Sequence, residues 1–111
     1  MANINVNISV KDAVETVKNY IENNGISTEC VGSYSNYTSS GQEVAMLVFE
    51  KYFMRTSNRA SLSVIIENLN GRTSVCSIGS GGGQNALFSF DWGAADSFAG
   101  LVEKALKKYI I

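Results

Sequence analysis

A glycine-rich segment near residue 80 is the first candidate for chemistry. Residues 79–85 read Gly-Ser-Gly-Gly-Gly-Gln-Asn. Consecutive glycines let backbone N–H groups converge on an anion, and phosphate-binding loops are rich in glycine for that reason. The known phosphate motifs are not matched, because Gln84 stands where a dinucleotide fingerprint has glycine and no Gly-Lys-Ser or Gly-Lys-Thr is present. The alternative interpretation is a flexible hairpin loop without a ligand.

A second candidate is the segment 52–59, which reads Tyr-Phe-Met-Arg-Thr-Ser-Asn-Arg. Arginine beside a planar aromatic ring can bind phosphate, carboxylate or a nucleobase, although a solvated hairpin turn has the same composition. Alternate connections of an antiparallel meander lie at the same end of the sheet, two strand spacings or about 10 Å apart. The sequence therefore predicts a weak anion site that joins this turn to the glycine loop, with the members Arg55, Arg59, Gly81, Gly82, Gly83 and Gln84.

Enzymatic machinery is sparse in this chain. It has no histidine, which is the usual general base near neutral pH, and its acidic residues are scattered along the sequence. Cys76 has no neighbouring base to activate it as a nucleophile, and two cysteines without histidine do not make the usual zinc site. We therefore expect no catalytic residue, no metal site and no cofactor, and a protein that is not an enzyme.

Composition bounds the class of protein. The chain has 111 residues, of which 45% are hydrophobic, and this predicts a single globular domain over 1–111. Nine basic and ten acidic residues give a net charge of −1, which provides no general attraction to nucleic acid or to an anionic membrane. No secretion pattern opens the sequence, and no apolar run approaches the roughly 20 residues of a membrane helix. We expect a cytoplasmic protein without nucleic-acid or membrane partners, in which Cys30 and Cys76 are buried free thiols.

The elements that must position the candidate residues begin with a strand and a helix. Polar and apolar residues alternate over 3–8, which predicts a strand with Ile4, Val6 and Ile8 on its core face. Ser9, three residues before an aspartate, resembles the start of a capping box. Apolar residues then recur at spacings of three and four, and this predicts a helix that ends at about Asn24.

The central part of the chain has the period of strands, and the last part has that of a helix. Asn70-Gly71 predicts a two-residue type I′ hairpin turn that aligns Ile66 with Val75. From Asp91 the helical period returns and predicts a long helix. The fold class is α+β: an antiparallel meander sheet with an N-terminal β-α unit and a long C-terminal helix packed on one face. The strands are expected at 27–37, 43–53, 60–69, 72–79 and 86–90.

The segment 43–53 is apolar on both of its faces. An antiparallel sheet that is covered on one side should show one polar face, so something must cover the second. Either the helices or a partner chain can do this, and the polar segment 32–40 is a further candidate for an exposed or dimer-forming edge. The sequence predicts a homodimer formed through the sheet. The alternative is a module that binds a small anionic ligand at the site described above.

Residues 44–109 resemble a family of small bacterial proteins of unknown function. The similarity is carried by Asn58-Arg59, which leads into a serine-rich strand, by the Ser-Gly-Gly loop with Gln84 after it, and by the segment 91–109. This resemblance implies no activity, cofactor or catalytic residue.

Overall fold

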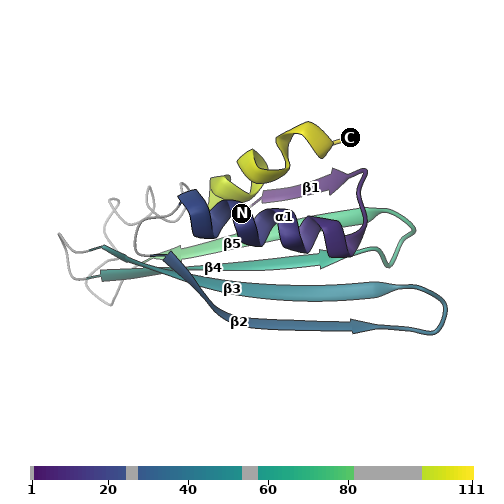
Figure 1. Ribbon diagram of the computed structural model, residues 1–111, viewed down its shortest axis with the longest axis horizontal. Coiled ribbons are helices and arrows are strands. Elements are labelled where there is room, and N and C mark those ends of the chain that lie inside the picture. Colours follow the sequence, from purple (N-terminus) through teal and green to yellow (C-terminus); the bar gives the residue numbers. More distant parts are fainter. Residues whose placement is uncertain (1, 25–27, 54–57, 82–98) are drawn as a thin grey trace.

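A five-stranded antiparallel sheet carries two helices on one of its faces (Figure 1). The computed structural model describes residues 2–24, 28–53, 58–81 and 99–111 of the chain. Residues 99–106 are α-helical and continue into a 3-10 turn. The other elements are, in chain order, β1 (Ala2–Val6), α1 (Val10–Asn24), β2 (Thr28–Tyr37), β3 (Glu43–Phe53), β4 (Asn58–Glu67), β5 (Thr73–Gly81) and the 3-10 turn η2 (Lys107–Tyr109).

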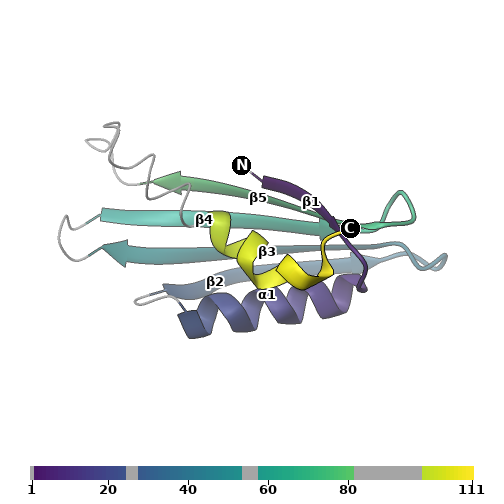
Figure 2. The same ribbon diagram turned by 90° about the horizontal axis from the view of Figure 1, so that it is seen from above.

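The strand order is β1-β5-β4-β3-β2. Strands β2 to β5 form the meander that the sequence predicts, whereas β1 pairs with β5 at the far edge. Helix α1 therefore connects the two edge strands, and it contacts β2, β3 and β4 on the way (Figure 2). The predicted N-terminal β-α unit is therefore divided between two layers, because β1 extends the sheet beside β5 and α1 covers one face of the meander.

The end of the chain covers the edge of β1. Asn7 N–H donates to the carbonyl of Tyr109 at 2.9 Å, and Ile111 N–H donates to the carbonyl of Asn5 at 3.0 Å. Ile110 forms an isolated antiparallel bridge with Val6 between these two bonds. Among the described residues, β2 is the other edge strand, and no further strand pairs with its outer side.

Helix α1 begins and buries its side chains as its sequence predicts. The hydroxyl of Ser9 accepts a hydrogen bond from Asp12 N–H at 3.1 Å, which caps the first turn. One correction concerns the strand before it: β1 ends at Val6, so Ile8 lies outside the strand and packs half-buried against the core. The chain must turn within three residues to begin the helix, and this ends the strand pairing early. The buried helix positions follow the 3.6-residue period at Val10, Ala13, Val17 and Ile21.

The hairpin between β4 and β5 has the predicted register and a different turn. Ile66 pairs with Val75, as the Asn-Gly signal requires. The turn is not the predicted type I′, because the hydrogen bond from Gly71 N–H to the Asn68 carbonyl (3.0 Å) places the two residues between them at its centre. Gly71 follows in the left-handed region with φ 84°. A turn followed by a left-handed glycine gives the same strand alignment in a five-residue loop, and glycine adopts this φ without strain.

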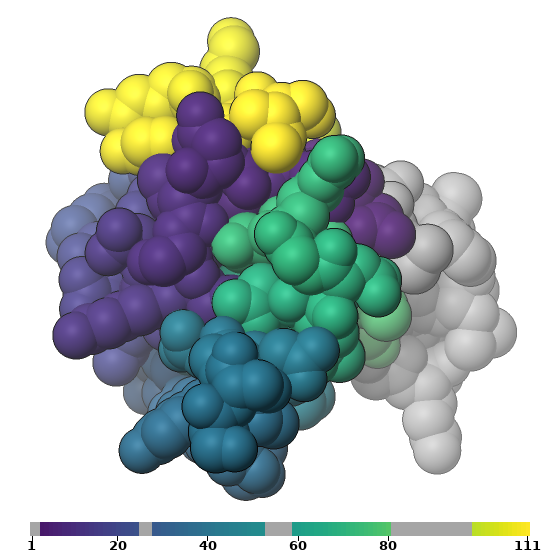
Figure 3. All heavy atoms as spheres, turned by 90° about the vertical axis from the view of Figure 1, so that its right-hand side faces the viewer, coloured from purple at the N-terminus to yellow at the C-terminus, as the bar shows by residue number. Residues whose placement is uncertain are grey.

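The loops 38–42 and 68–72 share this geometry and bind each other. Gly41 has φ 91°, and its N–H donates to the Thr38 carbonyl at 3.1 Å. In the other loop, the Gly71 N–H donates to the Asn68 carbonyl in the same way. Glu43 N–H donates to Asn68 Oδ1 at 2.6 Å, and Asn68 N–H donates to the Glu43 carbonyl at 3.2 Å. Figure 3 looks at this end of the molecule and shows the two loops in contact, in teal and green. The Asn68 side chain thus fixes one end of the sheet.

The core lies between the sheet and the two helices. Phe49, Leu62 and Val64 from the strands are fully buried and meet Ile21 of α1 and Leu106 of the C-terminal helix in one cluster. The predicted long C-terminal helix is wrong for the part of the chain that the structure describes, where the helix is short, with 11 residues over 99–109. Its end follows from Ile110, whose extended backbone (φ −68°, ψ 134°) brings the chain back to β1. The predicted strand 86–90 and the first part of that helix, 91–98, lie outside the described residues.

Candidate functional site

The predicted anion site falls at one end of the sheet. Arg59 lies at the start of β4 and Gly81 at the end of β5, and the register pairs Ala60 with Gly81. The two strand ends are therefore neighbours, as the meander predicts. Four other predicted members lie outside the described residues, so the site stays a prediction: Arg55, Gly82, Gly83 and Gln84.

The charge of Arg59 already has partners on its own sheet. Its Nη1 lies 3.1 Å from Glu50 Oε1, and its guanidinium lies over the ring of Tyr52, 5.7 Å from the centroid. Tyr52 is the direct cross-strand neighbour of Arg59, and Glu50 is the diagonal one. An anion at this position would have to approach a carboxylate that accepts a hydrogen bond from the same guanidinium, which lowers its electrostatic gain. The sequence prediction missed Glu50, which the register of the β3–β4 hairpin identifies.

The side of the sheet opposite the helices, which we call the outer face, carries a continuous apolar row. Its four members lie directly opposite one another on four adjacent strands, and Val48 and Ile78 extend the row toward the Arg59 end. Met46 is 37% exposed, Ile65 40% and Ile78 48%. The row consists of Tyr34, Met46, Ile65 and Cys76.

Small and charged residues surround this apolar row. Serines lie above and below it on β4 and β5, and their short side chains keep the outer face flat. The ion pair of Glu50 and Arg59 lies toward one end of the face, and Glu67 lies toward the other. In the described parts of the chain, both helices lie on the other side of the sheet (Figures 1 and 2). An apolar centre with a polar rim is the usual composition of a protein interface.

The two faces of β3 have different surroundings. Ala45, Leu47 and Phe49 are buried beneath the helices, whereas Met46 on the outer face is exposed. The two-sided apolar character of β3 is evident from its sequence, but Ile65 and Ile78 were not recognised there as outer-face residues. Every second residue of β4 and β5 belongs to the outer face, and in that series the two isoleucines stand among serines.

Both cysteines are free, as predicted, but neither is fully buried. Cys76 belongs to the apolar row. Cys30 lies on β2 beside a register shift, and its thiol donates to the Gly32 carbonyl at 3.5 Å. Cys30 pairs with Phe49 and packs half-buried against the core, so the two thiols lie on opposite faces of the sheet.

Two further observations concern the described residues. No group of three or more histidine, cysteine, aspartate or glutamate side chains lies close enough there to hold a metal ion. No helix in these same residues has both the length and the apolar character needed to cross a membrane.

The comparison with protein families covers nearly the whole chain. The model of a family of unknown function, DUF6054, matches residues 1–110. The chain belongs to this family. The resemblance over 44–109 to a family of unknown function is therefore confirmed, and the match extends to the N-terminal strand and helix. A search of curated proteins found no match, and a search of solved structures found none. The family description assigns no activity.

Proposed function

We propose that this chain is a non-enzymatic cytoplasmic protein that forms a homodimer by packing its outer face against that of a second copy. The observation that carries the proposal is the apolar row Tyr34–Met46–Ile65–Cys76, which crosses four strands on the side opposite the helices. Single exposed apolar side chains are ordinary on a monomer. A contiguous patch of them with a polar rim is rare on a monomer and marks an interaction surface.

The size of the outer face suits a second copy. Strands β2 to β5 have 9 to 11 residues each and β1 has five. With strands about 4.8 Å apart and about 3.3 Å per residue, the outer face spans at most roughly 19 × 33 Å, or about 600 Å² in projection. A standard interface buries about 800 Å² on each partner, so the face with its rim is close to what a stable dimer needs. Two such sheets stack about 10 Å apart, and a twofold axis brings the same apolar centre to both sides.

The exposed edge of β2 is a weaker candidate for self-association. Most of β2 is polar and exposed on both sides, and its register shifts between Cys30 and Gly32. Bulges and polar residues are the features by which natural proteins prevent edge strands from pairing with other chains. The alternative function is a small-ligand or anion-binding module at Arg59 and Gly81. The Glu50 carboxylate disfavours this function, because it is already paired with Arg59 and would repel an anion.

The first test measures mass in solution for two matched variants. Ile65→Glu places a charge in the apolar row, and Ile110→Glu places one beside β1 at the edge of the sheet, at almost the same exposure, 41% against 40%. We expect light scattering at micromolar concentration to give about twice the 12.0 kDa chain mass for the unmodified protein and for Ile110→Glu, and the chain mass for Ile65→Glu. A monomeric unmodified protein would overturn the proposal, as would a dimer that survives Ile65→Glu.

The two thiols provide a second test that distinguishes the face from the edge. We expect the rate at which a thiol reagent modifies Cys76 to fall as the protein concentration rises, because the dimer covers the outer face. The rate at Cys30 should stay constant, since that thiol lies on the edge strand β2 on the side that packs against the core. Protection of Cys30 alone would assign the contact to the edge and overturn the face-to-face arrangement.

A further inference from the structure

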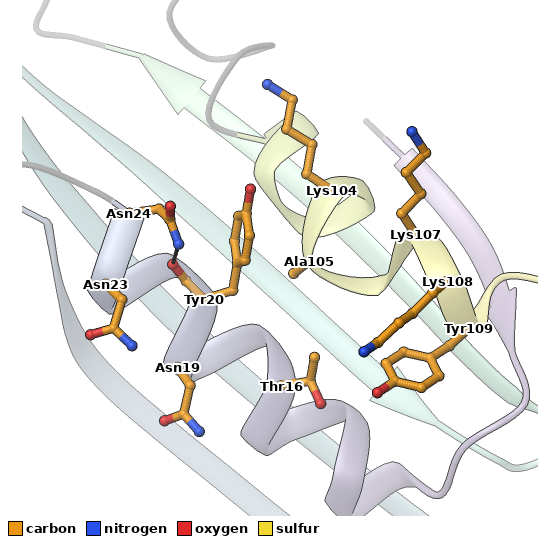
Figure 4. A pocket seen from close by; sticks show the side chains of 10 residues that line it. All are labelled: Thr16, Asn19, Tyr20, Asn23, Asn24, Lys104, Ala105, Lys107, Lys108 and Tyr109. Atoms are coloured by element: carbon orange, nitrogen blue, oxygen red, sulfur yellow. Dashed lines mark hydrogen bonds between the residues drawn. The ribbon is translucent and has the colours of Figure 1, made fainter.

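A groove of about 860 Å³ separates α1 from the C-terminal helix on the helical side of the molecule (Figure 4). Ala105 lies between the two walls, and Tyr20 and Tyr109 contribute half-buried aromatic rings. The groove is shallow and largely open to solvent, so a ligand there would lie along the two helices with one side exposed. The groove was not anticipated from the sequence, because it exists only where the two helices lie side by side.

One wall of the groove concentrates positive charge. Lys104, Lys107 and Lys108 line it, so it holds three of the nine basic residues of the chain and none of the ten acidic ones. Their spacing of three and four residues puts like charges on one helix face, which disfavours the helix by itself. Their position in its last turns offsets part of that cost through the helix dipole. Lys108 leans toward α1, with its Nζ 5.3 Å from the centre of the Tyr109 ring (Figure 4).

The opposite wall offers hydrogen-bonding groups without charge. Thr16, Asn19 and Asn23 of α1 face the groove, and Asn24 uses its side-chain amide to bond the Tyr20 carbonyl at 2.8 Å. The charged residues of α1 do not line the groove, and Asp12 lies one turn before Thr16 on the same helix face. No ion pair involves the three lysines within the described residues. The charges of Lys11, Asp12, Glu15, Lys18 and Glu22 lie outside the groove lining.

We infer that this groove binds a small organic phosphate of about mononucleotide size. The Lys108 ammonium group extends toward α1, whereas those of Lys104 and Lys107 extend away from it in this structure (Figure 4). Lysine binds phosphate as a point charge on a flexible stem, so the three charges of this wall supply the attraction for the phosphate. The amides and the threonine hydroxyl can bond hydroxyl or ring nitrogen groups, and the tyrosine rings offer a surface for a planar ring. The proposal is independent of the dimer, because the groove and the outer face lie on opposite sides of the sheet (Figure 1).

The test compares two triple variants with the same charge. Lys104→Gln/Lys107→Gln/Lys108→Gln removes the groove lysines, and Lys11→Gln/Lys18→Gln/Arg72→Gln removes three exposed basic residues elsewhere. Each variant changes the net charge from −1 to −4, because three positive charges are lost. Calorimetric titration of the full chain with AMP, ribose 5-phosphate, adenosine and inorganic phosphate in a low-salt buffer measures binding, and circular dichroism verifies the fold.

We expect AMP to bind the unmodified protein more tightly than inorganic phosphate or adenosine does. The groove variant should bind AMP at least tenfold more weakly, and the control variant should remain within about twofold of the unmodified protein. Equal losses in the two variants would show a general charge effect and overturn the site. Absence of binding for both AMP and ribose 5-phosphate at millimolar concentration would also overturn the site. Equal affinity for AMP and inorganic phosphate would overturn the proposal that the ligand is an organic phosphate.

Discussion

The two faces of the sheet are built from the same strands and have opposite surroundings. On the inner face, Phe49, Leu62 and Val64 are 0% exposed beneath the helices. On the outer face, Met46 and Ile65 are exposed by more than a third although they lie on the same strands. Because successive side chains of a strand point to opposite sides, one backbone can hold the fold with one face and leave the other available for a partner.

Serine residues also have different surroundings on the two faces. Ser77 lies on the inner face at 0% exposure, and its hydroxyl has no hydrogen-bond partner in the described residues. Ser63, on the outer face, lies between Val48 and Ile78 and is half-buried. The same residue type thus carries a desolvation cost on one face and keeps a small, flat surface on the other.

The largest expected effect comes from shortening a side chain on each face of β3. Phe49→Ala should lower the free energy of unfolding by about 3–5 kcal/mol, because it leaves a cavity in the core. Met46→Ala, three residues away on the outer face, should cost less than about 1 kcal/mol at concentrations where the chain is monomeric. Urea unfolding of both variants measures the two costs. Similar costs would mean that the outer face is buried within the monomer, and the contrast between the faces would be lost.

A smaller effect of opposite sign is expected at Ser77. Ser77→Ala should raise the free energy of unfolding by about 1 kcal/mol, because it removes a buried hydroxyl that lacks a partner. Ser63→Ala is the matched control on the outer face and should stay within about 0.5 kcal/mol of the unmodified protein. The same unfolding experiment measures both variants. If Ser77→Ala destabilises the chain, its hydroxyl is hydrogen-bonded in solution and the inner face contains a polar contact.

The smallest effect is expected for the ion pair on the outer face. Arg59 and Glu50 have side-chain exposures of 65% and 38%, and exposed pairs of this kind gain little because water screens them. Arg59→Gln and Glu50→Gln should each change the free energy of unfolding by no more than about 0.5 kcal/mol. A double-mutant cycle measures their coupling. A coupling above about 2 kcal/mol would show that the pair is shielded from water, which contradicts an open outer face.

Local sequence patterns determined most of the secondary structure. The alternation of apolar residues predicted β2, β3, β4 and β5 to within a few residues, and the three-and-four spacing with Ser9 as cap predicted α1. The Asn-Gly pair set the alignment of Ile66 with Val75, because a short loop leaves few registers open. The neighbouring positions of Arg59 and Gly81 followed from the meander alone.

Only the tertiary structure decided which elements lie against each other. Period two assigns Met46 and Phe49 to opposite faces but does not say which face the helices cover, because that depends on how α1 crosses from β1 to β2. The same holds for the end of the C-terminal helix, where pairing of Ile110 with Val6 ends the helical period. The groove between Tyr20 and Lys108 belongs to this second group, since it depends on contacts between segments more than 80 residues apart. Such contacts are set by packing of the whole chain, and no local pattern of residues records them.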